Sequence, residues 1–364
     1  MRKKIIKATL YIIGGIMALL LVLLLALWSI SPGKADPITG PDGAPLAGSI
    51  SVIESITLGG IDQYLFIRGA DSTKPVMLFL HGGPGSPETA FMINFNRDIE
   101  KDFVMVYWEQ RGAGKSYSKK IPAESMNMAQ FIADTRELTE YLMDRFNQEK
   151  IYLMGHSWGS LLGILTAYKH PEYFHAYFGI GQVGNQYEGE QLSYEWAKEQ
   201  ARNHDDHKSL RALERLSFPD SLATSEVWKK YLMTQRKYVN AFGGGTTRDA
   251  TSMWPLIKIV MQAREYTLND KMNFMAGSMF SLKHLWHEVV CTNLFHEIDS
   301  MHVPVYIFHG NHDYTTPYPI AKEFYEQLKA PHKGFFTFQN SAHSPVFEEA
   351  EKFNAILKDI TQGQ

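Results

Sequence analysis

The chain is poor in cysteine and carries little net charge. Its 364 residues include one cysteine, Cys291. A single cysteine excludes an internal disulfide framework and a zinc site built on cysteine ligands. A lone cysteine also acts more often as a small buried hydrophobe than as a nucleophile. The formal net charge is −3 without a clustered basic excess, so we expect no nucleic-acid partner.

Patterns of metal ligands are missing as well. The chain has 14 histidines, but neighbouring pairs such as His204-Asp205 and His312-Asp313 do not assemble into a metal motif. We therefore expect neither a metal nor a cofactor. Hydrophobic residues make up 45% of the chain, which is enough for one large domain or for a domain with a sizeable insertion.

One long apolar run stands at the N-terminus. Residues 10–28 are almost wholly apolar, a length that suits the hydrocarbon core of a bilayer, which takes about 20 helical residues. Four basic residues precede the run and Lys34 follows it closely, which predicts a cytoplasmic N-terminus. We expect residues 1–33 to be an uncleaved single-pass anchor, with the catalytic domain extracytoplasmic. Small residues around 33–35 leave signal-peptide cleavage and secretion as the alternative.

The remainder of the chain divides by its patterning. Residues 34–49 are rich in proline, glycine, alanine and aspartate and predict a flexible linker. Residues 50–182 alternate β-rich runs with helical spacings, and this alternation resumes over residues 302–364. It predicts an α/β fold of the α/β-hydrolase type, a mainly parallel sheet with helices on both faces. Residues 183–301 have helical spacings with few β-rich runs and predict a helical cap inserted into the core.

Two local signals support this division. Gly59-Gly60 separates two strand-like runs, 50–58 and 61–69, and predicts a hairpin. Residues 75–80 form a continuous apolar run, which is typical of a strand buried on both faces of a parallel sheet.

The sequence Gly155-His156-Ser157-Trp158-Gly159 fits the G-x-S-x-G nucleophile elbow. In this motif a sharp turn from strand to helix forces the serine into strained backbone geometry, so its neighbours must be small. Here the motif follows the strand-like IYLM and opens the helical pattern SLLGILTAY, which is the context the motif requires. We therefore predict Ser157 as the nucleophile.

A serine hydroxyl needs a base to take its proton. His343 follows the last predicted strand, where this fold places its base, and an acid must lie between serine and histidine in chain order. Asp313 meets this condition because it comes just after the run VPVYIFHG. Asp299 and Glu297 are weaker candidates since they precede that run, and a turn or helix-capping residue is the alternative role for Asp313.

The glycine-rich run HGGPGSP at residues 81–87 follows a buried strand, where the second oxyanion donor belongs. Its glycines let the backbone approach a developing negative charge. We predict that the N–H groups of Gly83 and Trp158 form the oxyanion hole. A glycine–proline turn without a ligand is the alternative.

Three further features have structural interpretations. The run EQRGAGKS at residues 109–116 lacks the spacing of a phosphate-binding loop, so we expect Arg111 and Ser116 to brace loops beside the site. His156 and His309 are expected to be buried histidines with satisfied hydrogen bonds.

Together the runs HGGPGSP, WEQRGAGKS, GHSWGS, HGNHDYTTP and SAHSP resemble the proline iminopeptidase family of α/β hydrolases. The resemblance covers residues 50–180 and 303–350, and the cap matches poorly. It implies the same roles for Ser157, Asp313, His343, Gly83 and Trp158, and release of N-terminal proline or another residue from short peptides.

Members of that family bind the substrate's free amino group with cap carboxylates. Glu188, Glu190 and Glu195 are the possible counterparts, and solvated helix faces are their alternative role. The N-terminal anchor is a departure, because typical members are soluble and cytoplasmic.

Other functions remain open at this point. A membrane-anchored carboxylesterase or amidase acting on small amide or ester substrates would share every catalytic residue and differ in its cap. An epoxide hydrolase or dehalogenase would need an aspartate at position 157. A tethered binding protein that has lost turnover is a third alternative. The patterns do not define the oligomeric state.

Overall fold

The computed structural model describes residues 2–249, 252 and 254–362. The outermost residues of the predicted anchor and of the second core segment, Met1 and 363–364, lie outside the described residues, as do residues 250, 251 and 253 of the predicted cap.

The strands are β1 (Ile50–Leu58), β2 (Ile61–Gly69), β3 (Val76–Leu80), β4 (Val104–Glu109), β5 (Ile151–His156), β6 (Phe174–Ile180), β7 (Val305–Gly310) and β8 (Lys333–Phe338). The helices outside the segment between β6 and β7 are α1 (Arg2–Ser29), α2 (Thr89–Phe95), α3 (Met128–Phe146), α4 (Trp158–Lys169), α11 (Tyr318–Gln327), α12 (Pro345–Glu348) and α13 (Ala350–Gln362). Between β6 and β7 lie α5 (Gln186–Asn203), α6 (His207–Glu214), α7 (Ser225–Ala241), α8 (Trp254–Gln262), α9 (Leu268–Cys291) and α10 (Leu294–Glu297). Short 3₁₀ helices cover Arg97–Lys101, Gly114–Ser116, Ala123–Ser125 and Pro171–Tyr173.

Eight strands form one sheet in the order β1-β2-β4-β3-β5-β6-β7-β8. The pairs β1·β2 and β2·β4 are antiparallel, and the other neighbours are parallel. Every residue of β3, β4 and β5 is buried, as their continuous apolar runs require of strands covered on both faces. The predicted α/β-hydrolase architecture is confirmed.

The predicted hairpin is also present. Gly59 and Gly60 connect β1 and β2 with φ of 51° and 76°, a left-handed conformation that glycine adopts without steric cost. A β-carbon on Gly59 would lie 2.4 Å from the carboxylate of Asp134 on α3. The glycine therefore serves the turn and also the close approach of α3.

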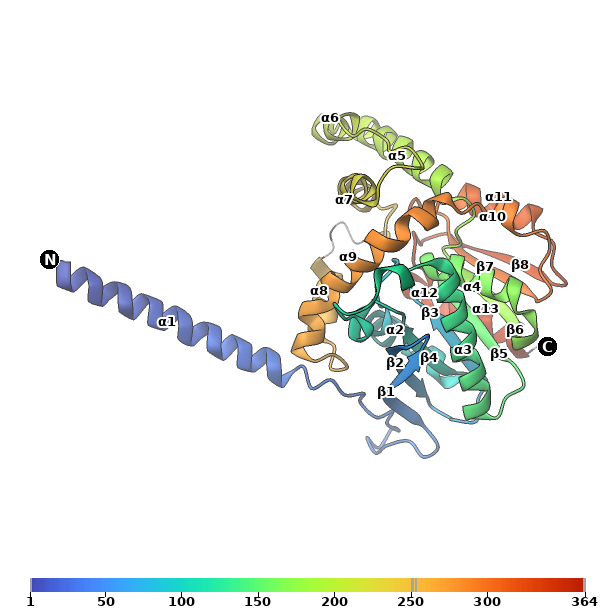
Figure 1. The fold of residues 1–364 in the computed structure, drawn as a ribbon, viewed down its shortest axis with the longest axis horizontal. Coiled ribbons are helices and arrows are strands. Elements are labelled where there is room, and N and C mark those ends of the chain that lie inside the picture. The colour runs from blue at the N-terminus through green and yellow to red at the C-terminus, as the bar shows by residue number, and fades with distance from the viewer. Residues whose placement is uncertain (1, 250–251, 253, 363–364) are drawn as a thin grey trace.

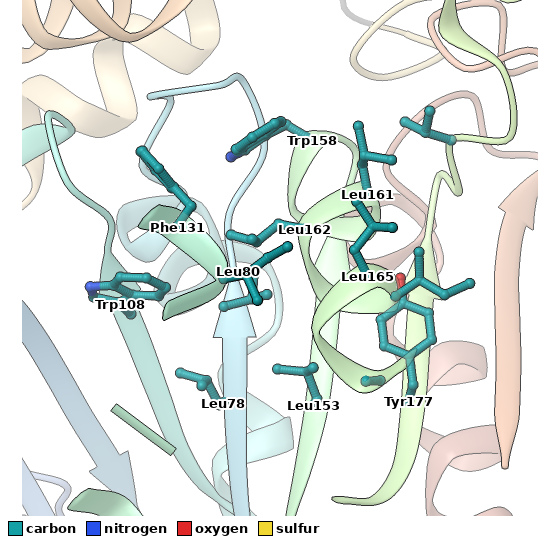
Figure 2. Close-up of a cluster of buried hydrophobic side chains, with 14 of the residues drawn as sticks. Leu78, Leu80, Trp108, Phe131, Leu153, Trp158, Leu161, Leu162, Leu165 and Tyr177 are labelled. Carbon is teal, nitrogen blue, oxygen red and sulfur yellow. The ribbon is translucent and has the colours of Figure 1, made fainter. Parts of the chain in front are cut away.

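Helix α4 packs its apolar side chains on the centre of the sheet. Figure 2 shows Leu161, Leu162 and Leu165 of α4 against Leu80 of β3 and Leu153 of β5, all buried in one cluster. This packing fixes the N-terminal end of α4 at the carboxyl ends of β3 and β5. The residue between β5 and α4 is Ser157.

In the described part of the segment between β6 and β7, the regular secondary structure consists of helices. This segment lies over one edge of the sheet (Figure 1). Two side chains of α9 hydrogen-bond to loops of the core. The hydroxyl of Ser278 donates to the carbonyl of Gly85 (2.7 Å), and that of Ser281 donates to the carbonyl of Gly112 (3.1 Å). Helix α9 therefore sits directly on the loops that follow β3 and β4.

Helix α1 projects away from the domain as an exposed rod (Figure 1). Its residues Ile5–Ser29 are long and apolar enough to cross a membrane, as judged by length and composition. The chain after α1 is bonded to the domain: Pro32 pairs with Thr267, and the N–H of Lys34 donates to the carbonyl of Arg264 (3.1 Å). Pro32, at the end of the expected anchor segment, and Lys34, the first residue of the expected linker, thus have specific partners on the domain.

The packing of α4 leads to a stability prediction. Leu162 is 0% exposed in the central cluster, whereas Leu222 is 77% exposed. Replacing Leu162 by alanine should lower the free energy of unfolding by about 2–5 kcal/mol, because it removes buried apolar surface and leaves a cavity. The matched control Leu222→Ala should change it by less than about 0.5 kcal/mol. Chemical denaturation of the full chain in detergent measures both, and equal effects would contradict the prediction.

Candidate active site

Ser157 occupies a strained turn between β5 and α4. Its φ and ψ are 56° and −120°, a combination that residues with a side chain rarely adopt. Its N–H donates to the carbonyl of Ile180 at the end of β6 (2.9 Å). Ser157 also lines a pocket, as the predicted role of an elbow nucleophile requires.

The flanking glycines make the turn sterically possible. A β-carbon on Gly155 would lie 2.1 Å from the carbonyl oxygen of Gly159, and one on Gly159 would lie 2.0 Å from that of Leu80. Both contacts are with backbone atoms that cannot rotate away. Helix α4 therefore lies so close to β5 and β3 that Gly155 and Gly159 cannot be replaced by a residue with a side chain without a backbone shift.

Asp313 and His343 form the second part of the site. Nδ1 of His343 donates to Oδ2 of Asp313 (2.8 Å), which leaves Nε2 as the nitrogen able to take a proton. Asp313 is fully buried and accepts further hydrogen bonds from the backbone N–H groups of Thr315 (2.8 Å) and Thr316 (2.9 Å). The hydroxyl of Thr316 also donates to Oδ2 of Asp313 (2.8 Å). The carboxylate is thus fixed in position from several sides.

The electrostatics favour a charged Asp313 and a neutral His343. Burial alone would raise the pKa of Asp313, but His343, His309 and their hydrogen bonds hold it well below its usual range. Burial lowers the pKa of His343, and the charge of Asp313 only partly offsets this effect. His343 is therefore available as a neutral base at neutral pH.

His156, next to Ser157, contacts the backbone of His343. Its Nε2 donates to the carbonyl of His343 (3.0 Å), its Nδ1 bonds to Oε1 of Glu88 (2.8 Å), and the two imidazole rings lie 4.8 Å apart. Burial would lower the pKa of His156, but Glu88 raises it above its ordinary value. His156 is a buried histidine with partners at both ring nitrogens, and it links the histidine loop to the elbow.

The glycine-rich loop after β3 lies beside the serine. A β-carbon on Gly82 would be 3.1 Å from Cβ of Ser157, and Gly83 has a φ of 121° that only glycine adopts readily. Gly83 and Trp158 line the same pocket as Ser157. Trp158 begins α4, where the first N–H groups lack acceptors within the helix. Both predicted oxyanion donors thus lie at the pocket.

Gln110 braces this loop, although no motif in the sequence marks it. Its side chain accepts from the indole N–H of Trp158 (2.9 Å) and donates to the carbonyl of His81 (3.1 Å). Its own N–H donates to Nε2 of His81 (3.2 Å), which can accept because burial lowers the pKa of His81 to about 4. Its position directly after β4, at the same sheet edge as the other loops, was the available signal.

Arg111 and Ser116 have partners farther from the serine. Arg111 is buried and bonds to Asp134 on α3 (2.9 Å) and to the carbonyls of Leu58 and Gly59 (3.1 Å each). The hydroxyl of Ser116 accepts from the N–H of Tyr64 on β2 (2.8 Å). Both residues tie the loop after β4 to the first hairpin.

Glu348 holds the loop that carries His343. Its Oε1 accepts from the N–H groups of Ala342 (3.0 Å) and Ser344 (3.2 Å), and its Oε2 accepts from that of Arg248 in the cap (2.6 Å). Burial raises the pKa of Glu348 to about 7. No motif marked this residue, because its partners are backbone groups.

The pocket at Ser157 has a volume of about 230 Å³ and mostly apolar walls. Cap helices α7 and α9 supply Leu232, Met233, Leu282, Trp286 and Val289. Two polar side chains from the cap, Gln186 and Arg236, also line it.

The three cap glutamates lie in different surroundings on α5. Glu188 is exposed, and Glu195 is exposed and pairs with Lys198 (2.9 Å). Glu190 is fully buried and accepts from Gln186 (2.7 Å) and from the guanidinium of Arg236, whose Nη1 lies 3.0 Å from Oε2. Of the three predicted glutamates, Glu190 therefore contacts residues that line the pocket. Its negative charge is paired with the guanidinium of Arg236.

A parallel sheet with an elbow serine, a following acid–histidine pair and a glycine-rich loop at one edge defines a class of hydrolases. The chain belongs to the α/β-hydrolase fold family, whose pattern matches residues 75–350. It is 35% identical over 315 residues to the probable aminopeptidase YbaC of Bacillus subtilis, covering 86% of this chain and 97% of that protein.

Two further relatives agree with this assignment. The proline iminopeptidase of Lactobacillus helveticus is 23% identical over 314 residues, which cover 82% of this chain and 94% of that protein. The crystal structure of a proline iminopeptidase from Mycobacterium smegmatis has the same fold, with a TM-score of 0.60 and 18% identity over 85% of this chain and 98% of that one. The resemblance to proline iminopeptidases is confirmed, and the chain is a hydrolase with peptidase relatives.

The electrostatics of His343 lead to a prediction for pH dependence. A base whose pKa is lowered stays neutral, and therefore active, at more acid pH. The acid limb of kcat/KM should thus have its midpoint below about 6.5, the ordinary value for histidine. A pH profile of kcat/KM measured with an uncharged substrate tests this, and a midpoint above that value would contradict it.

Proposed function

We propose that this protein is a serine hydrolase that removes N-terminal residues, proline or another small or apolar residue, from short peptides. The observation that carries the proposal is the Ser157 turn beneath the glycine-rich loop, together with the 2.8 Å bond between His343 and Asp313. The aminopeptidase and proline iminopeptidase relatives support the choice of a peptide substrate.

The proposed mechanism is acyl transfer in two steps. Ser157 attacks the scissile carbonyl while Nε2 of His343 takes its proton, and His343 then returns this proton to the leaving amine. Asp313 keeps Nδ1 protonated and stabilises the imidazolium that forms. Water hydrolyses the acyl-enzyme with the same base. The N–H groups of Gly83 and Trp158 receive the oxyanion, each contributing a few kcal/mol in such sites.

Recognition of a free amino group requires a carboxylate at the pocket. Among Glu188, Glu190 and Glu195, we favour Glu190 because it bonds to the pocket residues Gln186 and Arg236. An ammonium bound there would have to share the carboxylate with the guanidinium of Arg236. Glu188 and Glu195 point to solvent, which favours their alternative role on an exposed helix face.

The same ion pair favours a second candidate function, a carboxylesterase or amidase for small acyl substrates. With Glu190 neutralised by Arg236 and the remaining walls mostly apolar, the pocket suits an uncharged acyl group. This candidate uses the same Ser157, His343 and Asp313. It differs in making no demand for a free amine.

We also propose that α1 anchors the enzyme in a membrane as a single span, with the catalytic domain on the extracytoplasmic side. The length and apolarity of residues Ile5–Ser29 support a span, and the basic residues before it support the orientation. A signal sequence that is cleaved to release a secreted enzyme is the alternative.

The nucleophile is tested by replacing Ser157 with alanine. We expect kcat to fall by a factor on the order of 10⁶, because the triad acts as a unit, and covalent labelling by a fluorophosphonate probe to disappear. The matched control is Cys291→Ser, which removes the other nucleophilic candidate and should leave both labelling and turnover intact. Undiminished turnover in Ser157→Ala would refute the serine mechanism.

The substrate class is tested with proline, alanine and leucine arylamides, their N-acetylated forms and short nitrophenyl esters. An aminopeptidase should cleave the free-amine arylamides and spare the acetylated ones. Glu190→Gln should then lower kcat/KM for free amines by at least about tenfold, because a lost buried charge contact costs about 2–5 kcal/mol. The exposed Glu195→Gln is the matched control. Equal cleavage of acetylated and free substrates would favour the esterase or amidase.

A further inference from the structure

A group of apolar side chains is exposed on α8 and on the first turns of α9. Trp254 (71% exposed) and Ile257 lie on α8, and Met272 (66%) and Met275 (59%) lie on α9. We call these four residues the α8–α9 surface. Exposed apolar patches on a protein domain mark binding surfaces.

The end of α1 is bound between the same two helices. Nζ of Lys271, which begins the second turn of α9, bonds to the hydroxyl of Ser31 (2.8 Å) and to the carbonyl of Met261 at the end of α8 (2.8 Å). Pro32 pairs with Thr267, the cap of α9, and Arg264 pairs with Asp36 (3.0 Å). The exit of the chain from α1 is therefore attached to the turn between α8 and α9.

This attachment sets the distance between the α8–α9 surface and a bilayer. Residue 31 lies two residues beyond the end of the apolar helix, and it contacts Lys271 directly. The headgroup region extends roughly 5–7 Å beyond the hydrocarbon core on each side. Lys271 and its neighbour Met272 therefore lie close to the headgroup region when α1 spans the membrane.

The direction of α1 agrees with this placement. In Figure 1, α1 projects from the side of the domain on which α8 and the beginning of α9 lie. A span that follows the membrane normal therefore brings these two helices toward the membrane, together with α6 and α7, which lie on the same side of the domain (Figure 1).

The chemistry of α8 suits a lipid interface. Its sequence WPLIKIVMQ contains no acidic residue, places Lys258 beside Ile257 among its exposed residues, and buries Leu256 and Val260 against the domain. Tryptophan is enriched at the depth of the headgroups, and lysine is attracted by anionic lipids. The composition and the position of α8 thus both favour a lipid bilayer as the partner.

We infer that the α8–α9 surface is a second membrane contact, which seats the cap in the headgroup region next to the anchor. This inference rests on the proposed membrane span of α1. It adds that the domain is held against the bilayer in one orientation and does not swing on a free linker. The partner is the surface of a bilayer that contains anionic lipid.

The test uses the full chain in vesicles of phosphatidylcholine and phosphatidylglycerol. In a Cys291→Ser background, single cysteines replace Met272, Met275, Leu222 or Leu20, and each carries an environment-sensitive fluorophore. All four side chains are exposed outside a membrane, so labelling should not disturb packing. Retained hydrolysis by each labelled protein checks the fold. Quenching by aqueous iodide is compared with quenching by lipids that carry a nitroxide near the headgroup.

We expect labels at 272 and 275 to lose iodide quenching and to gain quenching by the lipid nitroxide. The label at 222, on a distant part of the cap, should behave as an aqueous control, and the label at 20 should lie within the bilayer. If positions 272 and 275 match position 222 while position 20 is in lipid, the inference is wrong and the anchor stands. If position 20 is also aqueous, the anchor fails and the inference with it. Shielding of 272 from iodide without nitroxide quenching would mean that another copy of the chain covers the surface, which also overturns it.

Discussion

The close approach of α4 to β3 and β5 is the constraint on which the rest of the site depends. The backbone oxygen of Leu80 would lie 2.0 Å from a β-carbon on Gly159, and that of Gly159 would lie 2.1 Å from a β-carbon on Gly155. This approach forces the turn at Ser157 into its strained conformation and presents the N-terminus of α4 at the sheet edge. Apolar packing of α4 on the sheet supplies the stabilisation that offsets the strain (Figure 2).

A second constraint is the burial of Asp313. A carboxylate removed from water must be neutralised or fully hydrogen-bonded, and Thr315, Thr316 and His343 together meet that requirement. The same bonds orient the imidazole of His343. The hydrogen bonds that orient His343 therefore also offset the free-energy cost of burying the Asp313 carboxylate. The orientation of His343 and the stability of its loop thus have one physical cause.

Local patterns made the fold predictable from the sequence, and they marked the candidate site residues. Gly59-Gly60 marks its hairpin, and Gly155 to Gly159 mark the elbow, because each signal lies within a few consecutive residues. The contacts of Gln110 with Trp158, of Glu88 with His156 and of Glu348 with Ala342 were not predictable. Each joins loops whose proximity exists only after the sheet has formed. The pairing of Glu190 with the pocket residue Arg236 is of the same kind because it joins two cap helices.

Helix α9 connects the end of α1 with the pocket at Ser157, two parts of the molecule that lie far apart in the sequence. Its first turns bind the end of α1 through Thr267 and Lys271, and its second half supplies Leu282 and Trp286 to the pocket. Between them, Ser278 and Ser281 fasten the helix to the loops after β3 and β4. A rigid helix held at both places cannot move relative to α1 without moving the pocket wall. The position of the domain on α1 and the shape of the pocket are therefore coupled by one element of the cap.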